Sequence, residues 1–240
     1  CLQAAAIDCF VLANNHVLDW GYAGLRETLA TLTRAGIKTA GAGSNLAEAQ
    51  APALLEVAGK GRVLVYAFGT PNSGVARDWA AGAARDGVNL LPDFAEPTLR
   101  RIAANITATK RSDDLVVVSI HWDANWGYAV PEEHVRFAHA LIDRAGVDAV
   151  HGHSSHHPKA IEIYRGKPIL YGCGDLLNDY EGISGYETYR AELALLYFVS
   201  FDRATKRLLR LSMTPMQIRG LRLNHAARVS LLDERLELAW

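Results

Sequence analysis

Polar clusters rich in histidine and asparagine follow three separate apolar segments of the chain. The clusters are Asn14-Asn15-His16, His121-Trp122-Asp123 and the run H-G-H-S-S-H-H at 151–157. The segments before them, at 7–13, 115–120 and 147–150, are short and mostly apolar, as in buried strands. Because sites in α/β sheets form beyond the carboxyl ends of strands, we expect the three clusters to converge.

Helical and extended patterns alternate along most of the chain. Helices are predicted at 21–35, 96–110 and 131–145, with a short helix or turn at 46–53. Further strands are predicted at 37–42, 61–69, 192–202 and 207–213, and a hairpin at 161–164 with 168–171. Residues 70–97 lack a clear period and are expected to form a long loop, a common place for substrate contacts. The alternation, followed by strand pairs, predicts an α/β sandwich with a mixed sheet.

The bulk composition describes an ordinary globular chain. With 240 residues, we expect one domain over 1–240. Lys plus Arg total 25 against 26 acidic residues, without a long basic run, so nucleic-acid binding is not expected. We also expect no membrane span and no signal segment, because no apolar run approaches the required length of about 18 residues.

Cys1, Cys9 and Cys173 lack C-x-x-C spacing and are interpreted as ordinary thiols. A lipid-bearing Cys1 is the alternative, but no polar tether follows it.

The residue types in the clusters suit divalent metal ions. Imidazole nitrogen and amide oxygen are ligands for zinc, manganese and iron. We interpret four residues as metal ligands: Asn15, His121, His153 and His156. Two ions about 4 Å apart would clamp a phosphate, and His16 would protonate the leaving oxygen. A single histidine at a strand end is more often an ordinary hydrogen-bonded residue, but three clusters together favour the metal site.

The remaining histidines receive lesser roles. We expect His151 and His157 to flank the site. His134, His139 and His225 are interpreted as ordinary helix or surface residues. No substrate-binding residue is identified from the sequence.

The motif L-A-N-N-H-V-L-D-W-G at 12–21 resembles the asparagine-histidine motif of the CapA, or poly-gamma-glutamate capsule biosynthesis, family of calcineurin-like metallophosphoesterases. The resemblance continues through A-G-I-K-T-A-G-A-G at 35–43, S-I-H-W at 119–122, G-H-S-S-H at 152–156 and I-E-I-Y-R-G-K-P-I-L-Y-G at 161–172. It implies an αββα sandwich. It further implies that Asn15, His121 and His153 bind one divalent ion (Mn, Fe or Zn), that His156 binds the other, and that His16 is the catalytic acid.

The sequence departs from the family pattern at several positions. Asp123 and Asn125 follow the middle histidine where relatives carry glycine and then an acid, so Asp123 either substitutes for that acid or caps a turn. Asp175 replaces a common asparagine, and we expect a supporting role for it. For Asp19 we favour a plain helix N-cap.

The family's acidic ligands should precede Asn15, where the only aspartate is Asp8, which we interpret as misplaced for coordination. The N-terminal strand and the bridging aspartate are therefore expected to be missing from what we interpret as a fragment. On this interpretation two-metal chemistry should fail in this segment, which leaves a single weakly held ion as an option.

Two functions from different classes remain open. The first is metal-dependent hydrolysis of phosphate monoesters or diesters, linked to poly-gamma-glutamate capsule synthesis. The second is non-catalytic capsule assembly or export, through binding of an anionic polymer or membrane-associated partners; an inert remnant of either is a third reading. Arg77, Trp79 and Arg85 are compatible with an anionic ligand or with an ordinary solvated loop. The resemblance suggests the bacterial cell envelope as the location.

Overall fold

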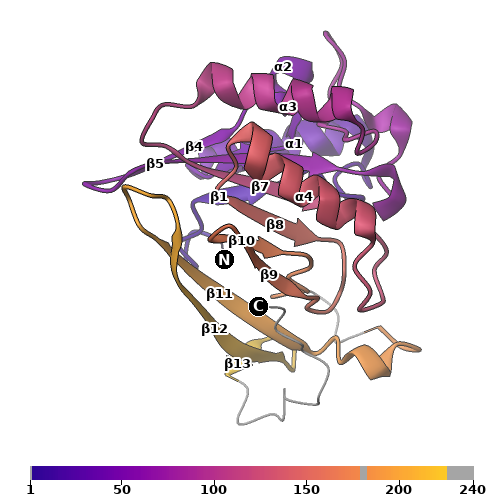
Figure 1. The fold of residues 1–240 in the computed structure, drawn as a ribbon. Helices are drawn as coiled ribbons and strands as arrows, with labels where there is room; N and C mark the ends of the chain where they lie inside the picture. Colours follow the sequence, from indigo (N-terminus) through magenta and orange to yellow (C-terminus); the bar gives the residue numbers. More distant parts are fainter. Residues whose placement is uncertain (1, 179–182, 226–240) are drawn as a thin grey trace.

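A six-stranded mixed sheet organises the computed structural model, which describes residues 2–178 and 183–225 (Figure 1). Its order is β4 (Ala53–Val57), β5 (Gly61–Gly69), β7 (Leu115–His121), β8 (Ala149–His153), β10 (Lys167–Leu170) and β9 (Ile161–Tyr164). The four inner strands pair in parallel, and β4 and β9 close the edges antiparallel. The predicted α/β fold with a mixed sheet is confirmed.

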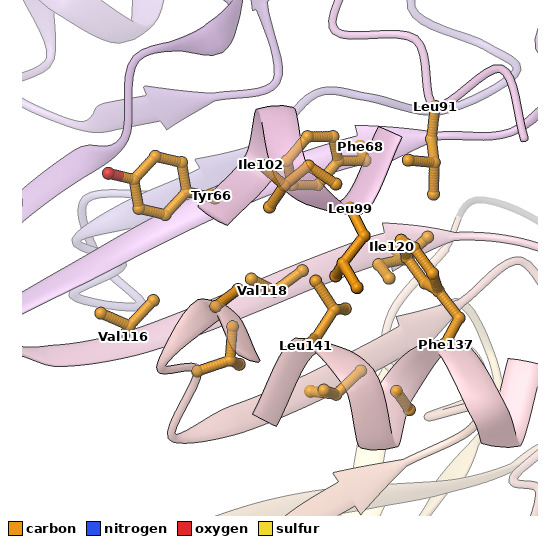
Figure 2. Packing of buried hydrophobic residues seen from close by; sticks show 14 of the residues in the cluster. Tyr66, Phe68, Leu91, Leu99, Ile102, Val116, Val118, Ile120, Phe137 and Leu141 are labelled. Atoms are coloured by element: carbon orange, nitrogen blue, oxygen red, sulfur yellow. The ribbon is translucent and has the colours of Figure 1, made fainter. Parts of the chain in front are cut away.

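Helices α3 (Glu96–Thr109) and α4 (Glu132–Ala145) cover one face of this sheet. The side chains buried between these helices and the sheet include Leu99, Val118, Ile120, Phe137 and Leu141 (Figure 2). Successive side chains of a strand point to opposite faces, so the alternate residues of β7 and β8 face away from these helices.

Those alternate residues are polar and lie side by side. Ser119 pairs in register with His151, and His121 with His153. The histidines predicted to bind metal therefore project from the sheet face opposite α3 and α4, at the carboxyl end of the parallel strands.

An N-terminal unit brings the first polar cluster to the same end of the sheet. Strand β1 (Cys9–Val11) pairs in parallel with β2 (Lys38–Ala40), and α1 (Gly21–Arg34) connects them. A Cβ on Gly41 would lie 2.7 Å from Ala13 Cβ and 2.8 Å from Ala67 Cβ. This close approach, which only glycine permits, sets the end of β1 against β5.

The remaining elements lie around this framework. A second sheet contains β11 (Leu193–Phe201), β12 (Leu208–Ile218) and β13 (Leu223–His225), and lies away from α3 and α4 in Figure 1. The others are α2 (Leu46–Gln50), the pair β3 (Ala42–Gly43) and β6 (Gly87–Val88), and 3-10 turns at Pro71–Ser73, Arg77–Trp79 and Glu187–Tyr189.

Several predicted boundaries were wrong. Strand β8 begins at Ala149 rather than 147 and includes His151 and His153, so these residues lie within a strand and not after it. Strands β4 and β13 were not predicted, and β12 continues to Ile218, because pairing with neighbouring strands extends structure through residues of weak local preference. The 70–97 segment contains short turns and β6 rather than one loop.

His134 lies in helix α4, as one of its two interpretations expected, but it is not a surface residue. It is 1% exposed and its ring stacks on Trp122 with centroids 4.6 Å apart.

Cys9 and Cys173 are free, and burial raises the pKa of their thiols to about 11 and about 12. Cys1 lies outside the described residues. Within 2–178 and 183–225, no helix has the length and apolar character needed to cross a membrane.

Candidate metal and phosphate site

The turn after β1 places His16 at the surface beside a carboxylate. The backbone N–H of His16 donates to Asn14 Oδ1 at 2.9 Å, an Asx turn that fixes the chain direction. His16 Nδ1 lies 2.8 Å from Asp19 Oδ2, and the two side chains are 72% and 50% exposed. The N-cap prediction for Asp19 was wrong, because Trp20 occupies that position without a side-chain bond and the turn directs Asp19 back to His16.

Asn15, His121 and His153 form a hydrogen-bonded row. His121 Nε2 lies 3.1 Å from Asn15 Oδ1, and His121 Nδ1 lies 3.0 Å from His153 Nδ1. Since the amide oxygen can only accept, His121 carries its proton on Nε2 and accepts at Nδ1. His153 then donates from Nδ1, and its buried Nε2 has a bare lone pair without a hydrogen-bond partner among the described residues.

Burial keeps these rings neutral. Loss of solvent lowers the pKa of His121 to about 4, with smaller contributions from His16 and His156. Burial also holds the pKa of His153 well below its ordinary value. Behind it, burial lowers the pKa of His151 to about 4, and Ser119 Oγ lies 2.9 Å from the Nδ1 of this residue. Neutral imidazoles keep the lone pairs that metal coordination needs.

His156 lies on the same cavity wall but outside this row. Its Nδ1 is 2.8 Å from Asp175 Oδ2, and its backbone N–H donates to Asn125 O at 3.0 Å. The ring stacks on Trp126, with centroids 5.3 Å apart. A carboxylate on Nδ1 fixes the ring's orientation and makes Nε2 the acceptor nitrogen, an arrangement common behind metal-ligating histidines.

One cavity of about 240 Å³ joins these groups. It is lined by Asn14, Asn15, His16, His121, Asn125, His153, Ser154, Ser155, His156, Gly174 and Asp175. The structure thus brings together all five residues assigned from the sequence. Asp8 is exposed, precedes β1 and does not line this cavity.

The donors match a divalent metal ion in kind. Asn15 Oδ1 and the orphaned Nε2 of the buried, neutral His153 are an amide oxygen and an imidazole nitrogen, the kinds of donor that a transition metal would use. Their directions are less favourable, because Asn15 and His153 lie against different nitrogens of His121. Across the described chain, no three His, Cys, Asp or Glu side chains are grouped to hold an ion.

A short turn that supports His121 was not predicted from the sequence. Thr70 Oγ1 and Ser73 Oγ both donate to His121 O, at 3.0 and 2.8 Å. Gly74 has φ of 86°, and a Cβ there would lie 3.3 Å from Asn15 Cβ. The signal was the turn-forming sequence T-P-N-S-G at 70–74, immediately after the strand predicted at 61–69.

Other residues of the loop contact its own backbone or the core. Arg77 Nη2 donates to Pro92 O at 3.5 Å, and Arg85 Nη2 to Ala80 O at 2.7 Å. Trp79 packs against the N-terminal core clusters. These contacts give each of the three residues a role in folding the loop.

The acid at 123 has a cationic partner. Asp123 Oδ2 accepts from Lys159 Nζ at 2.6 Å, and Asp123 does not line the cavity.

Two further histidines lie outside the cavity lining. His157 is buried and joins two loops by accepting from Gly127 N at 3.2 Å, whereas His225 is an exposed residue of β13.

Comparison with known proteins agrees with the motifs. The family model described as bacterial capsule synthesis protein matches residues 1–180. A probable polyglutamine synthesis accessory protein of Mycobacterium tuberculosis is 51% identical over 218 residues, which cover 90% of this chain and 57% of that protein. The PGA biosynthesis protein CapA of Bacillus subtilis is 30% identical over 167 residues, covering 70% and 41%. The chain therefore spans about half the length of these relatives.

A solved structure, described as a novel phosphatase from Mycoplasma pneumoniae, superimposes with a TM-score of 0.44 at 10% identity, covering 71% of this chain and 58% of that one. The match of the family model over most of the described residues, with the two relatives, decides the assignment. This chain belongs to the CapA family of bacterial capsule synthesis proteins.

Proposed function

We propose that this chain takes part in poly-gamma-glutamate capsule synthesis by hydrolysing a phosphoester with the help of divalent metal ions. The observation that supports this most is the convergence of the His16–Asp19 pair and the Asn15–His121–His153 row on one cavity. The printed names of the relatives, a polyglutamine synthesis accessory protein and a PGA biosynthesis protein, support the link to polymer synthesis.

The row of amide and imidazole groups is the proposed metal site. Asn15, His121 and His153 would hold one ion of manganese, iron or zinc. A second ion at His156, which Asp175 orients, would also need the bridging carboxylate that the family pattern places before Asn15. A bound ion would neutralise the charge of a phosphate and activate water for in-line attack.

His16 is the proposed general acid. Asp19 orients the imidazole and holds the proton on Nδ1, so Nε2 is the nitrogen that exchanges a proton with the substrate. Protonated on both nitrogens, His16 would give its Nε2 proton to the leaving oxygen of the ester as the bond to phosphorus breaks, and would keep its Nδ1 proton on Asp19. The high exposure of His16 suits a group that meets a substrate entering from solvent.

A second candidate is a metal-free assembly factor that binds an anionic polymer or a membrane-associated capsule partner. The observation that favours it is the direction of the donors, since Asn15 and His153 contact different nitrogens of His121. In this candidate the row serves as a hydrogen-bonded support for the cavity wall.

The test is hydrolysis of bis(p-nitrophenyl) phosphate and p-nitrophenyl phosphate with added Mn²⁺ or Zn²⁺. We expect metal-dependent turnover that EDTA and His121→Ala abolish. His139→Ala is the matched control, because His139 stacks on Tyr164 and bonds Glu162 outside the cavity. Absence of turnover with either metal, together with binding of poly-gamma-glutamate, would favour the assembly factor.

A further inference from the structure

Two loops next to the candidate metal ligands are tied to each other by side chains that no assigned role covers. The first loop follows His121, the last residue of β7, and the second follows His153, the last residue of β8, and carries His156. Loops at the ends of separate strands need a connection to keep donors on both at a fixed distance.

Lys159 makes the first tie. Its side chain is 4% exposed, and its Nζ lies 2.6 Å from Asp123 Oδ2. The backbone N–H of Lys159 also donates to Gly172 O at 2.9 Å. A Cβ on Gly172 would lie 2.8 Å from Lys159 Cγ, so the glycine provides the space through which the buried lysine reaches Asp123.

Ser154 makes the second tie, from a strained backbone. Its φ is 118°, a conformation that side chains rarely adopt, and Asp123 has φ of 67°. Ser154 Oγ donates to Asp123 O at 2.9 Å and lies 3.4 Å from Asn125 Oδ1. The strained serine lies directly between His153 and the segment that carries His156.

Backbone hydrogen bonds also join the two loops. His156 N–H donates to Asn125 O at 3.0 Å, and Trp122 N–H donates to His153 O at 3.1 Å. Two backbone hydrogen bonds therefore join the two loops in addition to the side-chain contacts.

We propose that Asp123, Ser154 and Lys159 form a cross-loop clamp, a set of positioning residues that fixes His121 relative to His153 and His156. The ion pair fixes the position of the first loop, and the serine bond fixes the direction in which the second loop leaves β8. The importance of the clamp for metal binding rests on the proposed function, whereas its effect on loop order does not.

The test compares variants of the full chain by amide hydrogen exchange and Zn²⁺ titration. Asp123→Asn with Lys159→Met removes the ion pair without leaving a buried charge unpaired. We expect amide exchange in 121–127 and 153–157 to rise together by about tenfold, and Zn²⁺ affinity to fall by about 10–100-fold. The matched control is Arg62→Met with Asp114→Asn, a buried ion pair at the opposite end of the strands, which should lower the melting temperature and leave Zn²⁺ affinity unchanged.

Substitutions of Ser154 separate positioning from plain stability. Ser154→Gly relieves the strained φ and should keep or raise the melting temperature, whereas Ser154→Ala keeps the strain, loses the bond and should lower it. Both should speed exchange in the two loops and weaken Zn²⁺ binding. Unchanged exchange in either loop, or Zn²⁺ affinity that follows only the melting temperature, would overturn the clamp. If the native chain binds no Zn²⁺, the proposed metal site fails, and the exchange measurement still decides whether the clamp exists.

Discussion

Asp19→Asn should reduce phosphoester hydrolysis while leaving the stability of the fold nearly unchanged. Asp19 and His16 are 50% and 72% exposed, and exposed ion pairs contribute only about 0.2–1 kcal/mol. The effect on catalysis should be larger, since a positioned general acid accelerates reactions by about 10²–10⁴-fold. Water can replace part of the lost carboxylate at this exposed site, so we expect kcat to fall by about tenfold, or about 1.4 kcal/mol of transition-state stabilisation.

A double-mutant cycle measures whether the two residues act as a unit. His16→Ala should lower kcat by about 10²-fold or more, and adding Asp19→Asn should cost nothing further. The assay is steady-state hydrolysis with thermal unfolding in parallel, and Glu132→Gln, in an exposed pair with Arg136, is the control. Additive losses, or unchanged kcat in Asp19→Asn, would show that Asp19 does not act through His16.

Three further predictions concern the framework of the site. Arg62→Met should lower the melting temperature, because the Arg62 guanidinium holds the pKa of Asp114 below its ordinary range. This stabilisation is present above the unfolded-state pKa of about 3.9 and is lost as the pH falls through the lower folded-state pKa. Unfolding measured against pH should therefore show the difference in stability between the native chain and the variant shrinking in acid. Ile120→Ala should cost about 2–5 kcal/mol in denaturant unfolding, because Ile120 is fully buried beneath the helices. Gly152→Ala should displace β8 and reduce folded yield, measured by circular dichroism, because a Cβ would lie 2.6 Å from Trp122 Nε1.

The framework was predictable where hydrophobic period and helix stops agree. Gly36 and Gly146 both adopt positive φ at the ends of α1 and α4, as helix-stopping glycines do. Strand β4 escaped prediction because its residues, A-L-L-E-V, suit a helix as well as a strand, and only pairing with β5 decides between them.

The candidate site was predictable in membership but not in detail. The polar clusters at three strand ends were sufficient to predict that five residues lie together, and all five line one cavity: Asn15, His16, His121, His153 and His156. The pairing of Asp19 with His16 required knowledge of the turn, since a residue just before a helix is usually a cap. The contact between Asp123 and Lys159 joins residues 36 positions apart, and no local pattern announces such a contact.

Equilibrium binding of Mn²⁺ and Zn²⁺ to the native chain and to Asn15→Ala and His153→Ala tests the central claim most directly. Calorimetric titration should give a saturable site in the native chain, weakened by at least about tenfold in both variants and unchanged in His139→Ala. Equal binding by all four proteins, or no saturable binding by the native chain, would contradict the assignment of Asn15, His121 and His153 as metal ligands.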